Sequence, residues 1–214
     1  MTLKAENISK KFGKNGLDSV SISISEKEFL CITGESGCGK TTLLNILSGM
    51  LTPDTGTVTL DGKNIYLDMK EQERTALRNQ TIGYMTQGNS LIPELTIWQN
   101  IVCPLELYGR KQDDNTVMQL FHRLGIDNVA DSFPSEVSGG EYRRALLARV
   151  LQLDAKIIIA DEPTSNLDEK SAVIVRQVLY EAYQNGKGVI VATHDKAFSE
   201  FNPQTLELHP GGET

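Results

Sequence analysis

The stretch Gly34-Glu35-Ser36-Gly37-Cys38-Gly39-Lys40-Thr41 fits the pattern G-x-x-x-x-G-K-[ST] at every fixed position. The apolar run Phe29 to Thr33 precedes it and an amphipathic segment, Leu43 to Leu51, follows it, which indicates a strand and then a helix. In that setting the glycines allow backbone N–H groups to converge on phosphate, and the helix N-terminus adds its dipole. The pattern therefore predicts a nucleotide site in which Lys40 reaches the β and γ phosphates and the Thr41 hydroxyl binds Mg²⁺.

The bulk composition is that of one globular domain spanning residues 1–214. The chain has 39% hydrophobic and 23% charged residues and a formal net charge of −7, which argues against a nucleic-acid partner. Its three cysteines, Cys31, Cys38 and Cys103, suggest neither a disulfide framework nor a metal cluster, which favours a reducing compartment. The N-terminus lacks the apolar core of a signal peptide, and no apolar run approaches the ~18 residues that span a bilayer. We therefore expect a cytosolic protein that reaches a membrane only through a partner.

The remaining apolar patterns predict an α/β fold. Two continuous apolar runs, Ile157 to Ala160 and Val189 to Ala192, are typical of strands buried on both faces of a parallel sheet. A helical segment around Ser171 to Tyr183 lies between them and supplies the crossover. Near the N-terminus, Ser19 to Ser25 alternates apolar and polar residues, which favours a half-buried antiparallel strand. A second such strand, Val58 to Leu60, precedes a turn signal.

The middle of the chain is different. From about Asn89 to Gly140 there is no buried-strand pattern, and Leu95 to Tyr108 and Thr116 to Leu124 have helical spacing. Prolines such as Pro104 are expected to interrupt this region. We predict the α/β class with a P-loop NTPase (RecA-like) parallel-sheet core, an N-terminal antiparallel β-subdomain and a helical subdomain inserted at about 89–140.

Candidate catalytic residues follow the predicted parallel strands. Asp161 and Glu162 end one apolar run, where Asp161 is suited to hold Mg²⁺ and Glu162 to polarise the attacking water. A pair of acids after a strand is usually a solvated loop, but the phosphate loop upstream reverses that expectation. His194 ends the next run and could hydrogen-bond the γ-phosphate. Gln87, after a strand-like segment, is a plausible ligand of Mg²⁺ or water.

A second glycine pair occurs in Val137-Ser138-Gly139-Gly140-Glu141. Ser138 and Glu141 fit S-x-x-E, which predicts a capping box at the start of a helix. A capped helix start preceded by glycines is also suited to bind an anion, so both interpretations can hold. Cys38, in the first glycine-rich stretch, has two interpretations as well. It is either a small buried side chain or a thiol whose pKa is lowered by the helix dipole and Lys40, in which case alkylation would block nucleotide binding.

In order and kind, these motifs resemble those of the ABC transporter ATPases, over essentially the whole chain. The resemblance implies catalysis by Glu162 and His194, and Mg²⁺ binding by Thr41, Gln87 and Asp161. It also implies that Phe12 stacks on adenine and that Asp168 belongs to the D-loop. The nucleotide-binding residues it implies are Phe12, Gly34, Glu35, Ser36, Gly37, Cys38, Gly39, Lys40, Thr41, Thr42, Gln87, Ser138, Gly139, Gly140 and Asp168.

The family pattern implies ATP and Mg²⁺ as cofactors and a head-to-tail dimer in which Ser138 to Gly140 of one copy close over the nucleotide of the other. It further implies an integral membrane permease as partner. The chain departs from the usual pattern at Val137, Glu141, Ala160 and Phe12, none of which removes a reacting group. Several stretches, such as Leu91 to Thr96, are similar to ATPases of lipoprotein-release, macrolide-export and antimicrobial-peptide-resistance systems.

Two other function classes remain open. A non-transport ABC ATPase of the cell-division or iron–sulfur assembly type is the alternative, since the iron–sulfur assembly type also ends the signature with glutamate. A kinase or GTPase with the same phosphate loop would leave Ser138 to Gly140 unexplained. The motifs do not identify the transported molecule or the direction of transport.

Overall fold

The computed structural model describes residues 1–13, 15–88, 90–107, 109–110 and 113–209. Its centre is a five-stranded parallel sheet with the strand order β6-β7-β8-β3-β9. The strands are β6 (Ile82–Met85), β7 (Ile157–Asp161), β8 (Gly188–Ala192), β3 (Phe29–Gly34) and β9 (Gln204–Leu208). All residues of β7 and β8 are buried, as their unbroken apolar sequences predict. Because the strands are parallel, their carboxyl ends meet at one edge of the sheet.

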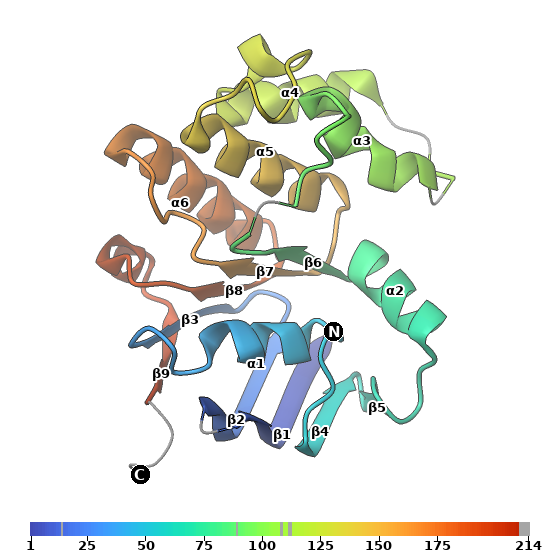
Figure 1. The fold of residues 1–214 in the computed structure, drawn as a ribbon, viewed down its shortest axis with the longest axis vertical. Helices are drawn as coiled ribbons and strands as arrows, with labels where there is room; N and C mark the ends of the chain where they lie inside the picture. The colour runs from blue at the N-terminus through green and yellow to red at the C-terminus, as the bar shows by residue number, and fades with distance from the viewer. Residues whose placement is uncertain (14, 89, 108, 111–112, 210–214) are drawn as a thin grey trace.

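A second, antiparallel sheet has the order β2-β1-β4-β5. It consists of β2 (Asn15–Ser25), β1 (Thr2–Phe12), β4 (Thr55–Leu60) and the short β5 (Lys63–Asn64). Helix α1 (Lys40–Leu47) lies between the two sheets, and its apolar side chains share one core with both of them (Figure 1). The predicted antiparallel N-terminal region is therefore confirmed, with its alternating run inside β2.

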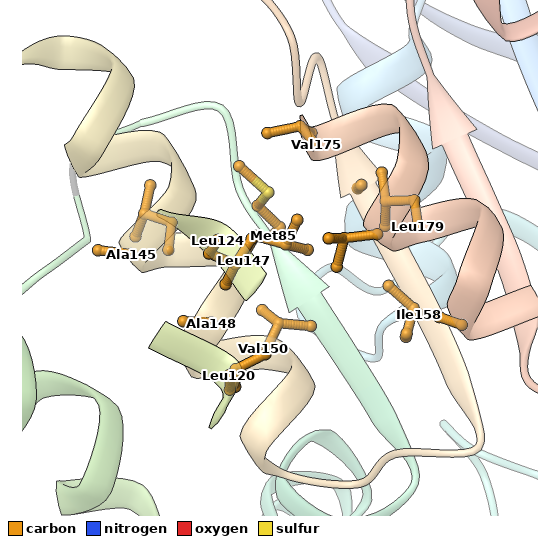
Figure 2. Close-up of a cluster of buried hydrophobic side chains, with 14 of the residues drawn as sticks. Met85, Leu120, Leu124, Ala145, Leu147, Ala148, Val150, Ile158, Val175 and Leu179 are labelled. Atoms are coloured by element: carbon orange, nitrogen blue, oxygen red, sulfur yellow. The ribbon is translucent and has the colours of Figure 1, made fainter. Parts of the chain in front are cut away.

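The other face of the parallel sheet is covered by two layers of helices (Figure 1). Helices α5 (Gly139–Gln152) and α6 (Glu169–Gln184) lie against the sheet, and α3 (Ile97–Leu107) and α4 (Asp114–Leu124) lie beyond them. The other helical elements are α2 (Glu71–Gln80), η1 (Asp127–Val129) and η2 (Lys196–Phe201). Figure 2 shows the second core, in which α5 side chains pack between those of α4, α6 and β6. The α/β fold class is confirmed.

The helices predicted for the middle of the chain are present. Among the described residues between 90 and 138 there is no strand, and α3 and α4 lie within two residues of their predicted positions. Two predicted bounds lie outside the described residues. They are Asn89, the predicted start of the insertion, and Tyr108, the predicted end of the first helix. The expected interruption at Pro104 is wrong, because Pro104 lies inside α3. Ile101 and Leu105 are buried on either side of it, and this packing outweighs one lost backbone hydrogen bond.

Candidate functional site

A cavity of about 740 Å³ lies at the carboxyl edge of the parallel sheet. It is bounded by the phosphate loop between β3 and α1, by the residues that follow β7 and β8, and by the start of α6. Its lining residues are Ser36, Gly37, Gly39, Lys40, Thr41, Thr42, Gln87, Asp161, Glu162, Thr164, Ser165, Asn166, Leu167, Glu169, Ala172, Arg176, His194 and Asp195. Segments distant in the sequence therefore supply one polar site.

The backbone of the phosphate loop requires glycine at its two ends. Gly34 has φ 140°, and a Cβ there would lie 2.3 Å from the carbonyl oxygen of Leu208. Gly39 has φ 104° and forms the N-cap of α1 without a side-chain hydrogen bond. A Cβ on Gly39 would lie 3.3 Å from the carbonyl oxygen of Gly16, at the turn of the β1–β2 hairpin. The first N–H groups of α1 thus stay uncapped by side chains, as an anion site requires.

Lys40 is a buried cation held by neutral acceptors. Its ammonium donates to the carbonyl oxygens of Gly34 at 2.6 Å and Glu35 at 3.2 Å, and lies 3.0 Å from Nε2 of His194. Because an ammonium can only donate, this contact is a hydrogen bond when Nε2 of His194 carries no proton. The same Nε2 is 3.3 Å from Oε1 of Glu162. The Lys40 ammonium and the Glu162 carboxylate thus both contact the same ring nitrogen of His194.

Thr41 and Asp161 form a polar pair suited to a divalent cation. The Thr41 hydroxyl donates to Oδ2 of Asp161 at 2.7 Å, while Oδ1 of Asp161 is buried and has no hydrogen-bond partner. Burial raises the pKa of Asp161, and the Thr41 hydrogen bond and the charges of Lys40 and Arg143 act in the opposite direction. An orphaned buried carboxylate oxygen beside a hydroxyl fits the oxygen donor set that Mg²⁺ prefers.

Glu162 occupies a strained turn directly after β7. Its φ is 46°, in the left-handed region, and its N–H donates to the carbonyl oxygen of Ala192 at 2.8 Å. Oε2 of its carboxylate accepts from the backbone N–H of His194 at 3.3 Å. Gln87, after β6, lines the same cavity. Only a few per cent of residues other than glycine have such a φ, and strained residues concentrate at active sites, which agrees with the catalytic role predicted for Glu162.

The second glycine pair lies outside this cavity. None of Ser138, Gly139 and Gly140 is among the residues that line it. Ser138 is the N-cap of α5, where its hydroxyl accepts from the Glu141 N–H at 3.3 Å and its own N–H donates to the Glu141 carboxylate at 2.8 Å. Hydrogen bonds from the hydroxyl and N–H of Ser138 hold the pKa of Glu141 below its usual value. The expected capping box is therefore confirmed.

Comparison with known proteins agrees with this geometry. The family model described as ABC transporter matches residues 17–165. The lipoprotein-releasing system ATP-binding protein LolD of Aquifex aeolicus (strain VF5) is 36% identical over 212 residues, covering 98% of this chain and 94% of that protein. The putative hemin import ATP-binding protein HrtA of Staphylococcus haemolyticus (strain JCSC1435) is 34% identical, covering 99% and 98%. The chain belongs to the ABC transporter family.

Solved structures place it with the ATP-binding cassettes of this family. The dimeric structure of MJ0796, a bacterial ABC transporter cassette, matches with a TM-score of 0.88 at 32% identity, over 97% of this chain and 94% of that one. A post-hydrolysis state of MJ0796 bound to ADP and Pi matches equally, with a TM-score of 0.88 at 31% identity over 99% and 97%. The expected family is confirmed, and the chain is an ABC ATPase and ATP-binding subunit. In the described part of this ABC ATPase, no helix has the length and apolarity to span a bilayer.

Some expected site residues of the cassette lie away from the cavity lining. Phe12 is 53% exposed at the end of β1, beside the hairpin turn that contacts the phosphate loop. Asp168 caps α6 by accepting from the Ser171 N–H at 2.9 Å. Cys38 is 2% exposed, and its Sγ would lie 2.7 Å from a Cβ on Gly34. That burial is what the small-side-chain interpretation of Cys38 requires, and the alkylation hypothesis stays a prediction.

Two arginines of the ABC cassette were missed by the sequence analysis. Arg143 on α5 donates to the carbonyl oxygens of Thr86 at 3.1 Å and Glu162 at 3.3 Å. Arg176 on α6 lines the cavity and donates to Asp195, the neighbour of His194, at 2.7 Å. Each arginine connects segments far apart in the chain. No local pattern could have selected them, because their partners are set by the tertiary structure.

Proposed function

We propose that this chain is the ATP-hydrolysing subunit of an ABC transporter that dimerises on ATP and drives a separate permease at the cytoplasmic face of a membrane. One observation carries the proposal. The second glycine motif forms an anion-suited helix start, yet it lies outside the cavity of its own chain. Such a motif acquires a use when a second copy presents its bound nucleotide to it.

The proposed roles within the cavity follow from the contacts of each residue. In the contacts described above, the Lys40 ammonium bonds to two carbonyl oxygens and His194 and to no carboxylate. When nucleotide binds, the ammonium turns from these partners to the β and γ phosphates. Thr41, Asp161 and Gln87 would hold Mg²⁺, which would neutralise phosphate charge. Glu162 acts as general base toward the attacking water, and His194 hydrogen-bonds to the γ-phosphate and orients it.

The composite site would require both protomers. Ser138, Gly139 and Gly140 offer the start of α5 to the partner's γ-phosphate, and the dimeric structure of the related cassette MJ0796 supports such pairing. Phe12 would stack on adenine from the hairpin next to the phosphate loop, where its exposed ring is accessible. Asp168 and Cys38 would contribute through backbone positioning, since Asp168 caps α6 and Cys38 is buried.

The transport role is the finer part of the proposal. Three relatives are named lipoprotein-releasing system proteins, which supports an exporter-type system, and another is named a putative hemin import protein. We favour the exporter-type assignment because the stretches that resemble that branch, such as 91–96, are independent of the nucleotide motifs. Affinity purification of the chain from its native membrane, followed by mass spectrometry, tests this directly. An integral membrane permease in stoichiometric amount is expected, and a cell-division or iron–sulfur assembly partner would contradict the assignment.

Glu162→Gln tests the catalytic role and the dimer together. Removing the base should stop turnover while leaving ATP binding intact, so that ATP accumulates in a stable dimer. Light scattering after size exclusion should give twice the monomer mass with ATP and the monomer mass with ADP. Adding Lys40→Ala to this variant should abolish the dimer. Turnover at the wild-type rate in Glu162→Gln would rule out the proposed base.

A further inference from the structure

Arg143 lies between two segments of the cavity wall, the one after β6 and the one after β7. It projects from the second turn of α5, and its guanidinium is bonded to the segment after β6 and to the turn after β7. One nitrogen donates to the Thr86 carbonyl at 3.1 Å. The other donates to the Glu162 carbonyl at 3.3 Å and to the Ser165 hydroxyl at 2.9 Å. All three acceptors belong to segments that reach the cavity with Gln87, Glu162 and Ser165.

The turn at Glu162 needs such support. A residue other than glycine is strained in the left-handed region, so its conformation persists only where surrounding contacts hold it. Its N–H is fixed to the carbonyl of Ala192. Its carbonyl accepts from the Ser165 N–H at 3.2 Å, from the Ser165 hydroxyl at 2.9 Å and from Arg143. These bonds fix the direction of the Glu162 Cα–Cβ bond, and the carboxylate at the end of the side chain accepts from the His194 N–H, 3.3 Å from Oε2.

The segment that carries Gln87 is held from the same helix. In addition to the bond from Arg143 to Thr86, the Tyr142 hydroxyl accepts from the Leu91 N–H at 3.0 Å. Arg149 donates to the Ser90 hydroxyl at 2.7 Å. Side chains of α5 thus anchor this segment at several points, and Arg143 anchors it at the residue next to Gln87.

We infer that Arg143 is a positioning residue for ATP hydrolysis, which ties the backbone of Glu162 and the residue preceding Gln87 to helix α5. This inference rests on the proposed function, in which Glu162 is the base. The guanidinium suits the role because its planar fork supplies donors in two directions at once. A lysine ammonium is a compact charge and cannot span the carbonyls of Thr86 and Glu162 in the same geometry.

The test compares Arg143→Ala, Arg143→Lys and Ser165→Ala with the wild type in steady-state ATP hydrolysis. Both Arg143 variants should lose kcat by on the order of 10- to 100-fold, because a small displacement of the base is costly, while KM for ATP stays within about twofold. Ser165→Ala should lose less kcat with the same unchanged KM. In the double variant Arg143→Ala with Ser165→Ala, the losses should combine less than multiplicatively, because both side chains hold the same carbonyl.

Arg123→Ala is the matched control, since Arg123 is an arginine on α4 that pairs with Glu181 away from the cavity. Its kcat should equal that of the wild type. Full activity in Arg143→Lys would assign the effect to charge and overturn the positioning role. Strictly multiplicative losses in the double variant, or a loss confined to KM, would overturn it too. If Glu162→Gln is inactive while Arg143→Ala is fully active, this inference fails alone. If Glu162→Gln hydrolyses ATP normally, the proposed function fails first.

Discussion

The starts of α1 and α5 are both glycine-rich helix N-termini, and they differ in what satisfies their backbone N–H groups. The α1 start has Gly39 as N-cap, no side-chain cap and no acidic residue in its first turn. The α5 start has Ser138 as N-cap, reciprocal bonds between Ser138 and Glu141, and therefore a carboxylate in its first turn. The first thus offers its N–H groups with no carboxylate beside them, whereas the second carries the Glu141 carboxylate, which accepts from the Ser138 N–H.

The difference indicates how the two halves of the site would act. At α1, a bound phosphate would accept from N–H groups that no side chain caps, beside the buried Lys40, which would favour tight binding by a single chain. At α5, phosphate must share the helix start with the Glu141 carboxylate, which favours weaker binding that depends on a second chain. Nucleotide affinity and dimerisation should therefore respond separately to changes at the two helix starts.

Lys40→Ala should have the largest effect. Loss of the buried ammonium removes a charge-assisted contact to phosphate, so ATP affinity should fall by on the order of 100-fold. Titration with a fluorescent ATP analogue measures this. Lys63→Ala, at an exposed lysine paired with Glu73, should bind as the wild type does. Retained affinity in Lys40→Ala would show that the uncapped α1 start binds phosphate without its lysine.

Ser138→Ala should separate the role of the α5 start in dimerisation from the role of the α1 start in nucleotide binding. The lost cap costs about 1 kcal/mol of stability, and single-chain ATP affinity should not change. In the Glu162→Gln background, ATP-driven dimerisation should weaken roughly tenfold, because a hydrogen bond to a charged group is lost. Asp113→Ala removes a comparable cap from α4, where Asp113 accepts from the Asn115 N–H at 3.3 Å. That control should lose similar stability and no dimerisation, and equal dimerisation in both variants would contradict a role of Ser138 at the interface.

Asp161→Asn concerns the carboxylate nearest the α1 start, which bonds to Thr41. Since burial raises the folded-state pKa of Asp161, the wild type loses stability as pH rises from the unfolded pKa through the folded one. Without nucleotide, Asn should therefore stabilise the fold at neutral pH. An effect of about 1 kcal/mol corresponds to a rise of roughly 2–4 °C in Tm. The gain should vanish below about pH 4, where Asp is protonated in both states. A lower Tm for Asp161→Asn at pH 7 would contradict a desolvated carboxylate.

The parts of this molecule that could be predicted from sequence are those with local causes. The phosphate loop needs positive φ at Gly34 and Gly39, and the burial of β7 and β8 is encoded in their unbroken apolar runs. Asp161 and Glu162 were placed in the site by their position after a buried strand. Arg143 could not be found this way, because its acceptors come from segments that approach α5 only in the folded chain. Pro104 shows the same limit, since tertiary packing overrides its local preference.

Glu141→Gln should have the smallest effect. It tests most directly the reciprocal bonds between Ser138 and Glu141 at the start of α5. Gln can replace Glu in a capping box, so the cost at neutral pH should be a few tenths of a kcal/mol, from the lost charge at the helix N-terminus. Because Ser138 lowers the folded-state pKa of Glu141, that contribution is present above the unfolded pKa and is lost as pH falls through the folded one. The Tm difference between variant and wild type should thus disappear in acid.

The same variant removes a negative charge close to where the partner's phosphate would arrive. Since the carboxylate is held by the N–H and hydroxyl of Ser138, at 2.8 and 2.7 Å, we expect dimerisation in the Glu162→Gln background to stay within about twofold. Glu106→Gln, at an exposed glutamate on α3, controls for net charge. A clearly tighter dimer for Glu141→Gln alone would mean that the carboxylate repels phosphate more than it caps the helix. In that case the electrostatic difference between the two helix starts would outweigh their difference in hydrogen bonding.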